Sequence, residues 1–135
     1  MSVESARTIF VTGATGLVGG HVAEEALTRG HRVRALVRSS SDTRLLDRLG
    51  VEKVPGDLAD ADALRRGVEG ADWVINCAAK VGDWGTLEEF RAINVDALKL
   101  LLDAAVDAKV KRFVHVSSLG VYEGRDHHGT DETTP

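Results

Sequence analysis

Three glycines at a fixed spacing constrain this chain more than any other feature of its sequence. Gly13, Gly16 and Gly19 follow the apolar run Ile9–Val11, which predicts a buried strand, and open a stretch with helical periodicity, residues 17–29. The first glycine allows a tight strand-to-helix turn, the second lets a ligand approach the backbone, and the third lets helix and strand pack closely. Free N–H groups at the start of that helix favour phosphate. The residues predicted to cradle phosphates are Gly13, Thr15, Gly16, Leu17, Val18 and Gly19.

Strand-like and helix-like segments alternate along the rest of the chain. Further strands are predicted at 33–37, 51–54, 72–76 and 112–116, and further helices at 42–49, 60–68 and 87–108. Such alternation indicates a parallel sheet with helices on both faces, and right-handed crossovers restrict the topology to doubly wound forms. We therefore expect residues 1–135 to form a single α/β domain of Rossmann type, with five strands in the order 3-2-1-4-5. A glycine turn in the first strand–helix unit of such a sheet predicts dinucleotide binding.

Composition and charge exclude several functional classes. The net charge of −4 provides no basic surface for nucleic acid. No apolar run approaches the roughly 20 residues that a membrane helix needs. A single cysteine, Cys77, rules out an internal disulfide and fits a reducing compartment. We expect a soluble, cytoplasmic protein with small-molecule ligands, no metal site, and neither nucleic acid nor a membrane as a partner.

The end of the second strand carries a cation where many dinucleotide-binding proteins carry an acid. An acidic residue there would hold the ribose hydroxyls of NAD, but the chain has Arg38 followed by Ser39 and Ser40. An arginine with hydroxyl donors beside it suits a 2′-phosphate, so the sequence favours NADP over NAD as the cofactor. The alternative is a solvated surface arginine.

Small and polar residues follow the third and fourth strands. Asp57 and Leu58 come after the third strand, where the Asp57 carboxylate would accept a hydrogen bond from the adenine amino group. The alternative for Asp57 is a cap on the next helix. Cys77, Ala78 and Ala79 follow the fourth strand, where small side chains would let the second half of the cofactor lie across the strand ends. Tight packing at a strand end is the alternative there.

Taken together, these pieces resemble the extended short-chain dehydrogenase/reductase family, also called the NAD-dependent epimerase/dehydratase family. The motifs that carry the resemblance are Thr12-Gly-Ala-Thr-Gly-Leu-Val-Gly19, Gly56-Asp-Leu58, Cys77-Ala-Ala79, Asn94-Val95 and Val116-Ser-Ser-Leu-Gly-Val-Tyr122. The stretch Ala78-Ala-Lys-Val-Gly-Asp-Trp-Gly85 is most similar to the 3β-hydroxysteroid dehydrogenase-like branch. The resemblance implies that Ser118 is the catalytic serine, which hydrogen-bonds the substrate oxygen. It also implies that Val116 and Ser117 line the nicotinamide side, that Asn94 is structural, and that Asp83 and Trp84 face substrate or else cap and pack their loop.

The family also uses a Tyr-x-x-x-Lys pair, in which the lysine lowers the pKa of a tyrosine that acts as acid or base. Tyr122 is the sole tyrosine, Asp126 stands four residues after it, and no lysine follows Lys111. His127 and His128 lie in a polar loop and are expected to be solvated. We therefore expect this chain to be the N-terminal part of a longer enzyme, incomplete relative to the full family fold and inactive by itself.

The leading interpretation is the NAD(P)-binding portion of an oxidoreductase, or of an epimerase or dehydratase. The parent enzyme would act on a carbonyl or a secondary alcohol, with a steroid-like alcohol as one substrate class that the resemblance implies. The alternative is a non-catalytic NADP-binding redox sensor, which has no need of Ser118. Dimers of this family commonly use helices that include the one predicted at 87–108, so a homodimer is also implied.

Overall fold

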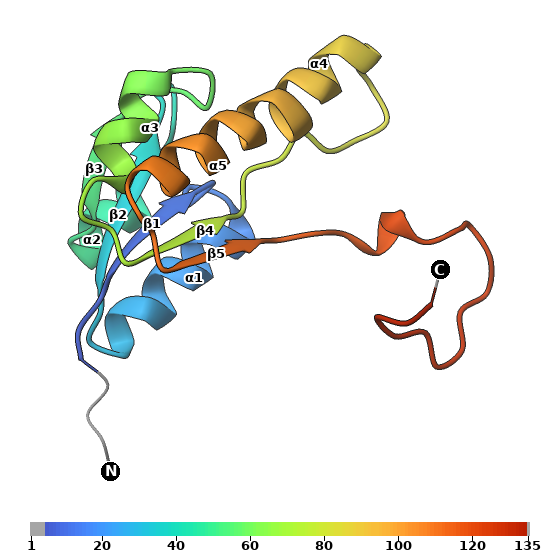
Figure 1. Cartoon of the computed structure of the whole chain (residues 1–135), viewed down its shortest axis with the longest axis horizontal. Coiled ribbons are helices and arrows are strands. Elements are labelled where there is room, and N and C mark those ends of the chain that lie inside the picture. Colours follow the sequence, from blue (N-terminus) through green and yellow to red (C-terminus); the bar gives the residue numbers. More distant parts are fainter. Residues whose placement is uncertain (1–4, 135) are drawn as a thin grey trace.

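The computed structural model describes residues 5–134 and confirms the predicted fold class: a five-stranded parallel sheet in the order β3-β2-β1-β4-β5 (Figure 1). The strands are β1 (Thr8–Thr12), β2 (Arg32–Val37), β3 (Glu52–Pro55), β4 (Trp73–Asn76) and β5 (Arg112–His115). The helices are α1 (Leu17–Thr28), α2 (Arg44–Leu49), α3 (Ala61–Val68), α4 (Leu87–Arg91) and α5 (Ala97–Asp107), with a short 3₁₀ turn at Leu119–Val121. Each predicted element is present, with ends that shift by one or two residues.

Helices cover the sheet on two faces, and the central strand β1 contributes to both cores. Figure 1 shows α1 on one face and α3 and α5 on the other. Side chains of a strand alternate between faces, so Phe10 packs with α3 and α5, whereas Ile9 and Val11 pack with α1 and α2. The apolar runs of the strands therefore reflect burial on both faces, as expected for a parallel sheet.

The first helix buries small residues against the sheet. Its buried positions are Gly19, Gly20, Ala23 and Ala26, whereas Val18 is 51% exposed. A Cβ atom at position 19 would overlap the Gly13 carbonyl group. Small residues thus let α1 lie directly against β1 and the turn between them.

The helix predicted at 87–108 is continuous but not uniform. It begins with a capping box, in which Thr86 and Glu89 each accept from the other's backbone N–H. A π-helical turn, Ala92–Asp96, separates α4 from α5. Turns of this kind insert one extra residue into a helix and occur often at functional sites.

Residues 5–134 contain neither a membrane-spanning helix nor a cluster of possible metal ligands. Between residues 5 and 134, no helix is long and apolar enough to span a bilayer. Over the same residues, no group of three or more His, Cys, Asp or Glu side chains could hold a metal ion.

Candidate functional site

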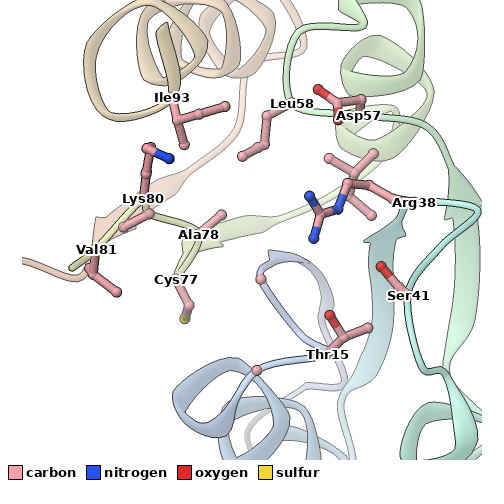
Figure 2. A pocket seen from close by; sticks show the side chains of 14 residues that line it. Thr15, Arg38, Ser41, Asp57, Leu58, Cys77, Ala78, Lys80, Val81 and Ile93 are labelled. Atoms are coloured by element: carbon pink, nitrogen blue, oxygen red, sulfur yellow. The ribbon is translucent and has the colours of Figure 1, made fainter. Parts of the chain in front are cut away.

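A cleft of about 520 Å³ opens where β1, β2 and β4 end, at the point where the strand order reverses. Open α/β sheets bind ligands at this topological switch point. Figure 2 shows side chains from both sides directed into the cleft, with the glycine turn between them. Nine predicted cofactor residues line it: Gly13, Thr15, Gly16, Arg38, Asp57, Leu58, Cys77, Ala78 and Ala79. The remaining lining residues are Leu36, Ser41, Lys80, Val81 and Ile93.

The three glycines of the turn are required for different reasons. Gly13 has φ +70°, and a Cβ there would lie 2.7 Å from the Ala78 backbone nitrogen. Gly19 lacks room because of the Gly13 carbonyl group. Gly16 has an ordinary φ of −90°, and the nearest atom to an added Cβ would be the Gly13 oxygen at 3.3 Å. The fold therefore demands glycine at positions 13 and 19, whereas at position 16 glycine mainly keeps the cleft side of the backbone open.

The start of α1 differs from the starts of α3 and α4. Its N-cap is Gly16, and no side chain of the described residues caps it. By contrast, the Asp60 carboxylate accepts from two backbone N–H groups of α3, and Thr86 caps α4. The first-turn amides of α1 consequently lack a side-chain acceptor and face the region of the glycine turn, where an anion would satisfy them.

Arg38 supplies the cation on the β2 side of the cleft. Figure 2 shows its guanidinium directed into the cleft. Within residues 5–134 it forms no ion pair or side-chain hydrogen bond, whereas nearby Arg34 is paired with Glu52 at 2.9 Å. Ser41 lines the cleft beside Arg38, in place of the predicted Ser39 and Ser40.

Asp57 is not the cap of the helix that follows it. That cap is Asp60, whose Oδ1 accepts from Asp62 and Ala63 at 3.0 Å. The Oδ1 atom of Asp57 instead accepts from the Ala59 N–H at 2.9 Å, which stabilises the turn after β3. This turn holds the Asp57 carboxylate at the cleft.

On the β4 side of the cleft, the side chains next to the strand are small and neutral, and a cationic side chain follows them. Burial raises the pKa of the Cys77 thiol, so the thiol stays protonated. Lys80 is held through its backbone: its N–H donates to Asn94 Oδ1 at 2.8 Å, and its carbonyl accepts from Asn94 Nδ2 at 2.9 Å. Asn94 lies in the π-helical turn, next to the lining residue Ile93. The irregular turn thereby fixes the loop after β4 over the cleft.

The carboxyl ends of three strands are joined by hydrogen-bonded side chains, of which Thr12 and Asn76 are buried. Thr12 Oγ1 donates to Asn76 Oδ1, and Asn76 Nδ2 donates to His115 Nδ1 at 2.9 Å. His115 therefore carries its proton on Nε2 when the ring is neutral. This chain of contacts sets the position of the segment that follows β5.

Six predicted site residues do not line the cleft. The side chains of Leu17 and Val18 border a separate groove with Trp73 and Ile75, and Gly19 is buried under the turn. The other three are the exposed residues Val116, Ser117 and Ser118. The Ser118 hydroxyl accepts from the Gly120 N–H at 3.1 Å and caps the 3₁₀ turn. The roles assigned to these six residues stay predictions.

Some residues that line the cleft were not predicted, because little in the sequence marks them as part of a binding site. Leu36 precedes the end of β2 and has the appearance of an ordinary core residue, while Ser41 lies three residues beyond Arg38. Ile93 belongs to the apolar face of the long helix, and only the π-helical turn directs it to the cleft. No pattern in the sequence marks that turn.

The fold and the cleft together define a dinucleotide-binding α/β domain. The profile of the family described as NAD(P)H-binding matches residues 13–134, so the chain belongs to that family.

Curated relatives carry names of sterol and oxoacid enzymes. The chain is 40% identical over 114 residues to sterol demethylase protein B of Methylococcus capsulatus, covering 84% of this chain and 35% of the relative. It is 32% identical to the sterol-4-alpha-carboxylate 3-dehydrogenase, decarboxylating, of Dictyostelium discoideum, covering 96% and 41%. It is 31% identical to the 2-alkyl-3-oxoalkanoate reductase of Shewanella oneidensis, covering 93% and 32%. The chain thus spans about a third to two fifths of the length of these relatives.

Two solved structures are also similar to this chain in both fold and sequence. The crystal structure of gox2253 matches with a TM-score of 0.84 and 37% identity, covering 96% of this chain and 40% of that one. A short-chain dehydrogenase/reductase superfamily protein from Agrobacterium tumefaciens with bound NAD matches with a TM-score of 0.69 and 36% identity, covering 82% and 32%. The resemblance to extended short-chain dehydrogenases/reductases, including their hydroxysteroid branch, is confirmed.

Proposed function

We propose that the cleft binds NADP and that the protein is an oxidoreductase acting on a secondary alcohol or the matching ketone. The observation that carries the proposal is Gly16: an added Cβ would be close only to the Gly13 oxygen, at 3.3 Å, yet the residue is glycine at the start of a helix that has no side-chain cap. Thr15 and the first-turn amides of α1 would hold the diphosphate. When bound, the nicotinamide would accept a hydride from an alcohol carbon or return it to a carbonyl carbon.

The preference for NADP rests on Arg38. A guanidinium that faces the cleft without a carboxylate partner among the described residues is available to a 2′-phosphate. Ser41 would add a hydroxyl donor, and Asp57 would accept from the adenine amino group. Loss of a charge-assisted contact of this kind costs about 1.5–3 kcal/mol, or roughly 10- to 100-fold in affinity.

We also propose that this chain alone does not turn over substrate. Ser118 would hydrogen-bond the substrate oxygen, but the alcohol proton needs an acid–base group as well. The sole tyrosine, Tyr122, donates its hydroxyl to the Asp131 carbonyl at 3.1 Å, and no lysine lies four residues beyond it. His127 does not substitute, because its ring nitrogens contact Thr130 Oγ1 and the Glu123 carbonyl in the same loop.

A common substrate feature links two of the relatives by name. A 2-alkyl-3-oxoalkanoate carries its carboxylate on the carbon next to the ketone, and a sterol-4-carboxylate carries it next to the carbon that a 3-dehydrogenase oxidises. We extend this feature to the present protein, whose substrate class would be a 3-hydroxy or 3-oxo acid on an apolar body, a sterol being one example.

Other expectations stay part of the proposal. The exposed side chains of Val95, Leu102 and Val106 on the long helix offer a face for a homodimer. A cytoplasmic location fits the single cysteine, Cys77. The redox sensor is not favoured, because the chain resembles proteins named as reductases and dehydrogenases.

Titration of the chain with NADPH and with NADH, followed by nucleotide fluorescence, tests the proposal. We expect NADPH to bind at least about tenfold more tightly than NADH, and Arg38→Ala to remove most of that difference. Arg65→Ala is the matched control, because Arg65 is exposed on α3 and paired with Asp62. Equal affinity for the two nucleotides would refute the NADP preference, and absence of binding by both would refute the cofactor site.

A further inference from the structure

We infer that Lys80 is the residue that binds the substrate carboxylate, which makes it the determinant of specificity for 3-hydroxy and 3-oxo acids over neutral alcohols and ketones. The inference rests on the proposed function. Arg38 and Lys80 lie on opposite sides of the cleft, with the glycine turn between them (Figure 2). Arg38 follows β2 and Lys80 follows β4, the neighbours of β1 in the sheet. A dinucleotide with its adenosine at Arg38 and its diphosphate at the turn would place its nicotinamide toward β4, where substrate must also lie.

The Lys80 side chain is fixed in direction. Two hydrogen bonds with the Asn94 side chain, one donated and one accepted by Lys80, hold the backbone of Lys80. The ammonium nitrogen lies 5.3 Å from the centre of the Phe90 ring. A Cβ at Gly85 would lie 2.9 Å from Lys80 Cε, so the loop passes close along the side chain. These contacts hold the Lys80 amine in position before any ligand binds, which lowers the entropic cost of binding.

The ammonium group itself is only weakly engaged. Its ion-pair partner within residues 5–134 is Glu89, at 3.9 Å, and no hydrogen bond to the Lys80 ammonium exists within the same residues. The same Glu89 oxygen already accepts from the Thr86 N–H at 2.9 Å in the capping box of α4. Exposed ion pairs of this kind contribute little to stability. The N–H groups of the Lys80 ammonium are therefore available to donate hydrogen bonds to a substrate carboxylate.

The surroundings of Lys80 suit an acid that carries an apolar body. Val81 and Ile93 line the cleft beside Lys80. The loop that follows exposes Val81 by 83% and Trp84 by 90%, and Leu87 at the start of α4 is 76% exposed. A cation followed by uncovered apolar side chains matches a carboxylate attached to an alkyl or ring system, whereas a small hydrophilic acid would leave those side chains in water.

The test compares 3-hydroxyoctanoate with its methyl ester, which lacks the carboxylate charge and carries one additional methyl group. Each is titrated into the chain, with and without saturating NADP⁺, and dissociation constants are taken from amide chemical shifts in nuclear magnetic resonance spectra. We expect the acid to bind about fivefold or more tightly than the ester, since one accessible ion pair is worth about 1 kcal/mol. Lys80→Met should remove that ratio, and Lys80→Arg should keep part of it.

Lys99→Met is the matched control, because Lys99 is exposed on α5 and paired with Asp103 at 2.7 Å. It should leave the acid-to-ester ratio unchanged. Equal binding of acid and ester, no binding of the acid, or an unchanged ratio in Lys80→Met would overturn the assignment. So would a Lys80→Met variant that loses NADPH affinity while keeping the ratio, because Lys80 would then serve the cofactor. Failure of NADPH to bind the wild-type chain, with the ratio intact, would instead refute the proposed cofactor site.

Discussion

Replacement of Gly16 by alanine should separate ligand binding from folding at the glycine turn. Gly16 has φ −90° and ψ 178°, a conformation that alanine adopts without strain. The nearest atom to the new methyl group would be the Gly13 oxygen at 3.3 Å, so a small local adjustment accommodates it. The methyl group would nevertheless stand over the backbone where a diphosphate has to approach.

Gly16→Ala should change the stability of the fold little and the affinity for NADPH much more. Alanine is a poorer N-cap than glycine by roughly 1 kcal/mol, and the less flexible unfolded chain offsets about 0.4–1 kcal/mol of that cost. The free energy of unfolding of Gly16→Ala should therefore stay within about 1 kcal/mol of wild type, a Tm change of a few degrees. Loss of a phosphate contact to backbone N–H groups costs about 1.5–3 kcal/mol, so NADPH affinity should fall about 10- to 100-fold.

Gly19→Ala should behave in the opposite way. Its Cβ would lie 2.6 Å from the Gly13 carbonyl carbon and 2.8 Å from Ala14 Cα, both backbone atoms that cannot swing aside. Overpacking of this kind costs about 1–3 kcal/mol, a large share of the marginal stability of a domain. We expect a lower Tm for Gly19→Ala, with loss of binding as a consequence of loss of structure.

Thermal denaturation and NADPH titration of the same samples provide the assay. Gly124→Ala is the control, because a Cβ at Gly124 would have no atom within 4 Å and the residue lies outside the cleft. If Gly16→Ala binds NADPH as tightly as wild type, the argument that ligand approach explains Gly16 is wrong. If Gly16→Ala melts as early as Gly19→Ala, the distinction between the two glycines is wrong.

Three further predictions concern packing, capping and charge. Gly67→Ala should destabilise the fold by about 1–3 kcal/mol, because its Cβ would lie 2.6 Å from Phe10 Cε1, and Phe10→Leu should recover part of that loss in a denaturant double-mutant cycle. Asp60→Ala should cost about 1 kcal/mol in the same assay, since the carboxylate caps α3; a neutral result would count against the cap. Hydrogen bonds from Arg44 hold the pKa of Asp42 at about 2, below its ordinary 3.8, so this pairing stabilises the fold above pH 3.8 and is lost as the pH falls through about 2; carboxyl NMR titration should show the pKa returning toward 3.8 in Arg44→Gln.

The sheet was predictable because its signals are local and repeated. The strands β1, β2 and β4 contain short apolar runs that end at or just before a polar residue, and the strand order follows from crossover handedness. The glycine turn was equally clear, since Gly13 and Gly19 leave the backbone no alternative at the start of α1. Arg38 could be located because it stands directly after β2.

The parts of the site that escaped prediction depend on contacts between distant segments. The hydrogen bonds between Asn94 and Lys80 connect residues that are 14 positions apart in the sequence. Asn94 lies in the π-helical turn, which no periodicity in the sequence indicates. The exposure of Leu17 and Val18 follows from the choice of Gly19 and Gly20 as the buried face of α1. The close approach of the helix to the turn after β1 selects these small residues.

The most direct test of the central claim is a crystal structure of the chain with NADP⁺. We expect the diphosphate against the turn from Gly13 to Gly16 and the first amides of α1, with the 2′-phosphate on the Arg38 guanidinium and the nicotinamide half across Cys77 and Ala78. A dinucleotide found in the groove beside Trp73, or one with its adenosine at the β4 end of the cleft, would contradict it.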